Sequence, residues 1–158
     1  MNAKQRFTIL TLLAILLIPA GSAFAQSEAD AIQAIRAQIG ADRQALIAAN
    51  LRLTEAESQN FWPLYREFHT KIDGLADRRL AILINFRDNF DTLDDEVSEQ
   101  IIKDYFKLQQ DLIKLKKQYA KKMNKVIPAK KTLRYFQMEN KMDAIIDFEM
   151  TKIVPLAE

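Results

Sequence analysis

Apolar residues recur at intervals of mostly three or four positions along most of the chain. A first row comprises Phe61, Tyr65, Phe68, Ile72, Leu75, Ile82 and Phe86. A second row has nearly the spacing of a coiled-coil helix and comprises Ile101, Tyr105, Leu108, Leu112, Leu115, Tyr119, Met123 and Val126. Each row falls on one face of a helix, although Arg79 occupies a position where the first row calls for an apolar residue. Neither row alternates with a period of two, so the pattern predicts helices rather than strands.

Two weaker rows flank this region and predict a shorter helix at each end. The first, from Ala29 to Asn50, has a row formed by Ile32, Ile35, Ile39, Leu46 and Leu53. The last restarts near Thr132 and carries Leu133, Phe136, Met138, Met142, Ile145, Ile146, Met150 and Ile153. We therefore predict an all-α protein built on a long antiparallel helical hairpin, with its bend at residues 90–95 and a shorter helix at each end.

Local signals mark where the helices begin, bend and end. Thr54 and Glu57 have the spacing of a capping box, with Leu53 before the cap. Pro63 removes one backbone hydrogen bond from the first long helix, so we expect a bend there and a curved hairpin. The second long helix carries its apolar row from Ile101 to Val126. Asp94, Asp95 and Glu96 lie where it should begin, and it should end near Ile127 and Pro128.

Residues 1–25 have the features of a secretory signal peptide. Lys4 and Arg6 precede the apolar run from Phe7 to Ile18, and small residues surround a cleavage position before Gln26. We therefore expect export to a bacterial periplasm and a single mature domain over residues 26–158. The chain has no cysteine, which excludes disulfides and a lipid-modified cysteine.

Composition argues against an enzyme. With one histidine, no cysteine and few glycines, the chain lacks the residues of His-rich zinc sites, thiol catalysis and phosphate-binding loops. We predict no catalytic site, no metal site and no cofactor. His69 and Asp73 could share a metal, but a solvated histidine is the simpler interpretation. The methionine pair, Met138 and Met142, could bind copper, although core filling is favoured.

Charge is unevenly distributed. The net charge of +2 falls to zero once the signal segment with Lys4 and Arg6 is removed, so nothing predicts nucleic-acid binding. Acidic residues crowd the predicted bend: Asp88, Asp91, Asp94, Asp95, Glu96 and Glu99. They lack the spacing and the glycine of an EF-hand loop, so helix capping explains them better than calcium binding. Lysines dominate the next helix, and we name Lys114, Lys117 and Lys121 as candidate client-binding residues.

The lysine-rich helix has two interpretations. The simpler one is a solvated face whose aliphatic stems cover the edge of the hairpin. The functional one is a basic, partly apolar surface that attracts acidic unfolded proteins, or anionic lipid headgroups at a membrane surface.

The segment Leu53-Thr54-Glu55-Ala56-Glu57 resembles the Leu-Thr-x-x-Gln motif of the Spy/CpxP family of periplasmic helical proteins. Ile127-Pro128-Ala129-Lys130-Lys131 occupies the place of a second copy. Glu57 and Lys131 stand where the motif has glutamine, and Pro128 replaces its threonine. The tail from Ile127 to Leu156 is also similar to uncharacterised exported proteins of Gram-negative bacteria.

The resemblance implies a curved four-helix protomer, an antiparallel dimer and ATP-independent chaperone or envelope-stress work. We therefore expect a periplasmic binding protein that shields apolar segments of unfolded clients. The alternative is a non-enzymatic stress or signalling accessory that docks one defined partner protein. Because the predicted helices leave more apolar surface than one small protomer buries, we also expect a homodimer.

Overall fold

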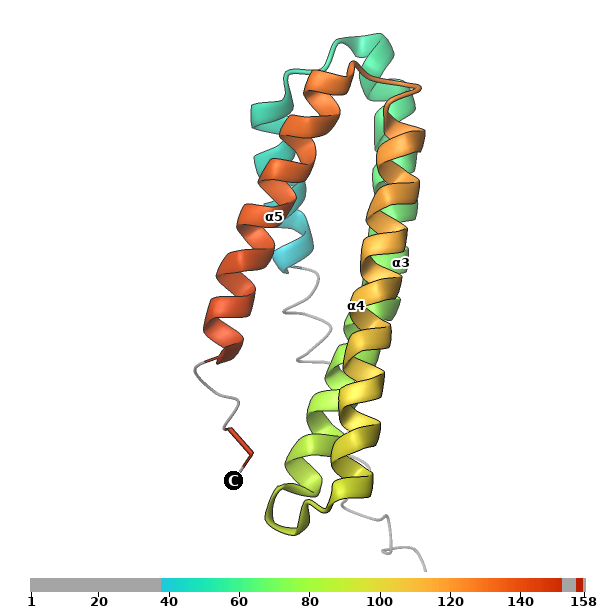
Figure 1. Cartoon of the computed structure of the whole chain (residues 1–158). Helices are drawn as coiled ribbons and strands as arrows, with labels where there is room; N and C mark the ends of the chain where they lie inside the picture. Colours follow the sequence, from blue (N-terminus) through green and yellow to red (C-terminus); the bar gives the residue numbers. More distant parts are fainter. Residues whose placement is uncertain (1–37, 152–155, 158) are drawn as a thin grey trace, which may run out of the picture. The chain divides into compact units, whose positions relative to one another are not determined.

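The computed structural model describes residues 38–151 and 156–157 (Figure 1). The predicted signal peptide, Ile32, Ile35, Ile153 and Pro155 lie outside the described residues. The chain divides into two compact units, with the boundary between Ala45 and Leu46. Before this boundary, residues 38–45 are helical, and the Gln38 side-chain amide donates to Asp42 Oδ1 at 3.0 Å. From Leu46 on, the helix continues to residue 51.

Regular structure in the described region is helical, which confirms the predicted all-α class there. The elements after residue 51 are α3 (Glu55–Asp88), the 3-10 turn η1 (Phe90–Thr92), α4 (Asp95–Met123) and α5 (Ala129–Thr151). Figure 1 shows α3 and α4 side by side, and ion pairs join Glu67 to Lys122 at 3.1 Å and Arg78 to Asp111 at 2.7 Å.

The start of α3 agrees with the prediction from sequence. Thr54 accepts a hydrogen bond from the Glu57 backbone amide at 3.3 Å, and the Glu57 carboxylate accepts one from the Thr54 amide at 2.7 Å. This capping box satisfies two backbone donors that a helix start leaves without partners. From there α3 continues without interruption through Pro63.

The start of α4 agrees with the acidic residues expected there, whereas its end differs from the prediction. The helix begins at Asp95, because the Asp94 carboxylate caps it by accepting from the Val97 amide at 2.8 Å. It ends at Met123, and the Ile127 amide folds back to the Met123 carbonyl at 2.9 Å. The helix therefore ends about one turn before the predicted end at Ile127. The turn that follows Met123 places the Ile127 side chain in the core.

Likewise, α5 starts before the predicted Thr132. The Pro128 carbonyl accepts from the amides of Lys131 at 2.8 Å and Thr132 at 3.1 Å, so Pro128 opens the helix. A proline suits this place because it has no amide hydrogen of its own to satisfy.

The main core lies where the end of the first helix, the start of α3, the end of α4 and the start of α5 meet. Its buried members are Ile47, Leu51, Phe61, Tyr65, Phe68, Tyr119, Met123, Ile127 and Tyr135. Aromatic rings meet edge to face, as in the pair Phe61 and Tyr135 with centroids 5.4 Å apart. The first row therefore predicted its share of the core correctly at Phe61, Tyr65 and Phe68.

Five positions of the predicted apolar rows are exposed instead of buried: Ile39, Leu46, Tyr105, Leu133 and Ile145. Leu46 is 52% exposed, while Ile47 and Leu51 form the buried face of the first helix. Tyr105 is 48% exposed, and its ring lies against the exposed Phe106 ring. On α5 the core takes Tyr135, whereas Leu133 is 60% exposed.

Candidate protein-binding surface

The helix α4 exposes large apolar side chains on the side that faces away from α3. Ile102, Phe106 and Ile113 are between 52% and 59% exposed. At about 100° per residue these three fall within roughly 40° of one another around the helix. They form an apolar strip on a helix whose other face is already packed through Leu108 and Tyr119. We call this side the outer face of α4.

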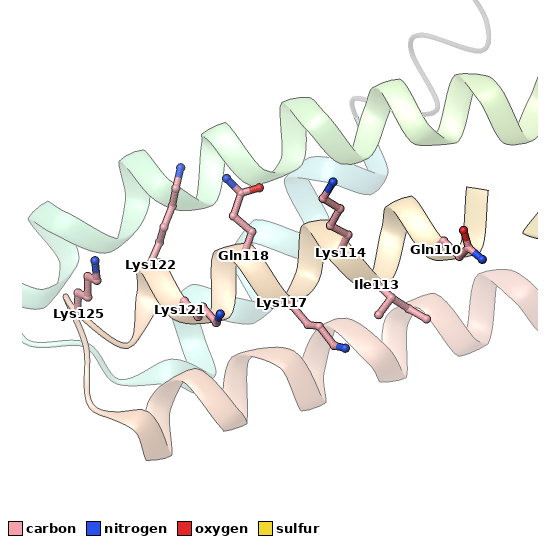
Figure 2. Close-up of a pocket in the computed structure, with 8 residues that line it drawn as sticks. All are labelled: Gln110, Ile113, Lys114, Lys117, Gln118, Lys121, Lys122 and Lys125. Atoms are coloured by element: carbon pink, nitrogen blue, oxygen red, sulfur yellow. The ribbon is translucent and has the colours of Figure 1, made fainter. Parts of the chain in front are cut away.

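A basic groove follows the strip toward the end of α4 (Figure 2). It has a volume of about 820 Å³ and is lined by Gln110, Ile113, Lys114, Lys117, Gln118, Lys121, Lys122 and Lys125. The candidate residues Lys114, Lys117 and Lys121 are thus brought together, and each is exposed. Ile113 belongs to both the strip and the groove, so apolar and basic chemistry are continuous on this surface.

Most of the positive charge in the groove is not neutralised by nearby carboxylates. Among the described residues, Lys117, Lys121 and Lys125 have no carboxylate within ion-pair distance. In contrast, Lys122 pairs with Glu67 at 3.1 Å and lies 4.5 Å above the centre of the Tyr119 ring.

The neighbours of Lys122 are electrostatically coupled. The Tyr119 hydroxyl and then the Lys122 ammonium hold the pKa of the Glu67 carboxyl below its ordinary value. Burial, with a further contribution from Glu67, raises the pKa of Tyr119 to about 12. Near neutral pH the Glu67 carboxyl is therefore ionised and the Tyr119 hydroxyl protonated. Because Lys122 is paired with Glu67, it is less available to a ligand than the other groove lysines.

Charge along the outer face is ordered. Acidic Asp95 and Glu99 come first, the apolar strip follows, and Lys117 comes last. All these positions are exposed and fall within about 60° around the helix. From the start of α4 toward its end, the outer face is therefore first acidic, then apolar and then basic.

The two positions that depart from the glutamine motif meet in space. Lys131 Nζ lies 2.5 Å from the Glu57 carboxylate and also donates to the Arg52 carbonyl at 2.8 Å. Lys131 is therefore the main cause that lowers the pKa of Glu57 below its ordinary value. Of the other motif positions, Ile127 is buried, Leu53 packs against the core and Pro128 is exposed. The Glu57–Lys131 pair therefore joins the start of α5 to the start of α3.

Nearby cations also stabilise the end of the first helix. Arg52 has a positive φ of 50°, a left-handed conformation that often ends a helix. The Arg134 Nε donates to the Asn50 carbonyl at 2.9 Å, alongside the bond from Lys131 to Arg52. Two carbonyls at a helix end, where the dipole is negative, thus receive positively charged donors from α5.

The prediction of a solvated His69 was wrong. Its Nε2 lies 3.2 Å from the buried Glu139 carboxylate and 3.4 Å from the Tyr135 hydroxyl. The Tyr65 ring covers it, with centroids 4.2 Å apart. Sequence reasoning missed Tyr135 and Glu139 because they lie four apart on a helix whose predicted apolar row ran elsewhere. The carboxylate beside His69 is therefore that of Glu139 on α5.

Within the part of the chain that the structure describes, no three His, Cys, Asp or Glu residues converge as a metal site would require. None of its helices is long and apolar enough to cross a membrane. No known family model, curated protein or solved structure matches the chain at a significant level.

Proposed function

We propose that this protein is an ATP-independent, chaperone-like binding protein of the periplasm that shields apolar segments of other proteins. The observation that carries the proposal is the outer face of α4, where exposed Ile102, Phe106 and Ile113 lead into a basic groove. Contiguous exposed apolar surface beside charge is typical of a protein-binding site.

The two parts of the surface have separate roles in capture. The lysines attract acidic clients over roughly 8 Å at physiological ionic strength, which increases the rate of encounter. The apolar strip then holds a client by removing its apolar side chains from water. Lysine stems add apolar contact because only their ammonium groups need water. Anionic lipid headgroups are the competing ligand for the same cations.

The finer architecture is part of the proposal. We propose that α3 and α4 act as one long antiparallel hairpin, curved at Pro63, with a shorter helix at each end. The pairs Glu67–Lys122 and Arg78–Asp111 support this arrangement. The resemblance of residues 53–57 to the Spy/CpxP motif supports the same architecture and function, with Glu57 and Lys131 forming an ion pair at the motif positions.

A charge-reversal experiment tests capture. Changing Lys114, Lys117 and Lys121 to glutamate should slow protection of an unfolded acidic client, measured by light scattering without ATP, most strongly at low salt. Changing Lys71, Lys103 and Lys130 to glutamate is the control, because it reverses the same charge outside the groove. Absence of protection by the wild-type protein against every client would refute the chaperone function. If the wild type protects and the Lys114, Lys117 and Lys121 variant protects equally well at all salts, capture rests on the apolar strip alone.

The alternative is an envelope-stress or signalling accessory that docks one defined partner. The ordered outer face of α4 favours it, because a fixed sequence of acidic, apolar and basic patches discriminates between partners. Crosslinking in the native envelope distinguishes the two functions. An accessory should give one crosslinked protein, whereas a chaperone should give many.

A second copy of this chain matches the outer face of α4. Glu99 and Lys117 are equally far from Leu108 along the helix, and Ile102 and Ile113 are nearly so. Two antiparallel α4 helices that cross at the level of Leu108 would place acidic residues against basic ones and the strips against each other. The proposed homodimer and a client therefore compete for this face.

A further inference from the structure

A second groove, separate from the outer face of α4, lies between the end of the first helix and α5. It has a volume of about 380 Å³ and is lined by Leu46 and Asn50 from one side and by Arg134, Gln137, Met138, Lys141 and Met142 from α5. This volume is in the lower part of the range for small-ligand sites. We propose that the groove binds the carboxyl terminus of a polypeptide whose last residue is apolar.

The chemistry of the walls fits the two ends of such a ligand. Arg134 and Lys141 supply two cations, and no carboxylate is among the lining residues, so the groove favours an anion. Leu46, Met138 and Met142 supply an apolar surface. Methionines adapt to different apolar side chains, because their chains are flexible and polarisable. The walls therefore place an apolar contact beside an anion contact.

The polar side chains identify a peptide rather than a fatty acid. The Asn50 amide nitrogen donates to the Leu46 carbonyl at 2.8 Å, which leaves its amide oxygen as an acceptor for a peptide N–H. Gln137 offers a second carboxamide at the rim. Only three apolar side chains line the groove, which suits one residue better than a long acyl chain.

Arg134 is held in position for this role. Its Nε donates to the Asn50 carbonyl at 2.9 Å, so the rest of its guanidinium can turn to a ligand carboxylate. Met138 and Met142 are also packed against the core, which fixes the floor of the groove. The site is thus positioned by the same contacts that fasten the first helix to α5. It is independent of the basic groove and of the proposed chaperone function.

Methionine-methyl NMR can test this proposal directly. The probe is an acetylated pentapeptide ending in Ala-Leu with a free carboxyl group, titrated into the protein. We expect the Met138 and Met142 signals to shift in a saturable manner. The same peptide with an amidated end should bind about tenfold more weakly, because it lacks the charge that Arg134 and Lys141 recognise.

Variants separate this site from its surroundings. Lys141→Gln should weaken binding of the free-acid peptide several-fold, while Lys130→Gln, on the same helix but outside the groove, should not. The triple glutamate variant of Lys114, Lys117 and Lys121 should bind the peptide normally, even if its client capture fails. Equal binding of acid and amide peptides would overturn the proposal. So would saturable shifts with dodecanoate but none with the peptide.

Discussion

The Thr54 hydroxyl is the clearest single-residue contribution to stability at the start of α3. Thr54→Ala should lower the free energy of unfolding by about 1 kcal/mol, because it removes the acceptor for the Glu57 amide. Thr70→Ala is a matched control on the same helix. Its exposed hydroxyl bonds only the Arg66 carbonyl, so its loss should change stability little. Chemical denaturation of both variants provides the measurement, and equal midpoints would remove the capping role of Thr54.

Glu57 gives a pH-dependent prediction. Its folded pKa lies below the ordinary 4.5, so the ionised carboxylate stabilises the fold above that pH and loses this effect as pH falls through the folded pKa. Glu57→Gln keeps the capping box but loses the charge. The wild type should therefore be more stable than Glu57→Gln at pH 7, and the difference should shrink in acid.

The partner of Glu57 supplies the control. In a protein that already carries Lys131→Gln, Glu57→Gln should lower the free energy of unfolding at pH 7 much less, because the ion pair is already absent. Urea denaturation between pH 3 and pH 7 measures all four proteins. A loss of the same size with and without Lys131 would show that the two charges are not coupled.

The sequence could predict the residue contacts that are local. The hydrogen bonds between Thr54 and Glu57 follow from a three-residue spacing, so the pattern alone indicates them. Glu57 and Lys131 are distant in sequence, and only the path of the chain brings them together. His69 and Glu139 pose the same problem, because a histidine with polar neighbours on its own helix gives no sign of a buried partner on another.

At the scale of the element, the face of the first helix can be tested by adjacent substitutions. Ile47→Ala should destabilise the protein by about 2–5 kcal/mol, because Ile47 is fully buried in the core. Leu46→Ala should change stability by less than about 0.5 kcal/mol, since Leu46 is 52% exposed. Denaturation midpoints of the two variants show which face of the first helix is buried. A larger loss for Leu46→Ala would restore the face that the sequence pattern predicted.

Periodicity predicted whole helices better than their faces and ends. On α3 the aromatic row was dense enough to fix the buried side at Phe61, Tyr65 and Phe68. On α5 apolar residues surround the helix, so spacing did not distinguish buried Tyr135 from exposed Leu133. The bend expected at Pro63 stays a prediction.

At the scale of the whole molecule, acidic, apolar and basic side chains that are spaced along the sequence lie together on the outer face of α4. Acidic residues near the bend looked like caps, and Asp94 does cap α4. Asp95 and Glu99 lie exposed beyond it, on the same face as Ile102 and Lys117. The lysine candidates could be named from the sequence, but the exposed apolar strip was missed because α4 had been assigned a single apolar row. A helix with one packed and one exposed apolar face has surface left for a partner.

The proposed homodimer makes the last prediction, and charge exchange gives it a defined register. Sedimentation at micromolar concentration should show two chains for the wild type. Lys117→Glu should weaken the dimer about tenfold. When the two α4 helices cross at the level of Leu108, the introduced carboxylate lies against Glu99 of the other copy, and symmetry repeats this repulsive contact. Glu99→Lys should weaken it similarly. Combining both changes in one chain should restore the dimer, because each contact then has opposite charges again, with their order reversed. A wild-type monomer across the concentration range would reject the dimer. A double variant weaker than either single one would reject this register and leave the outer face of α4 to the client.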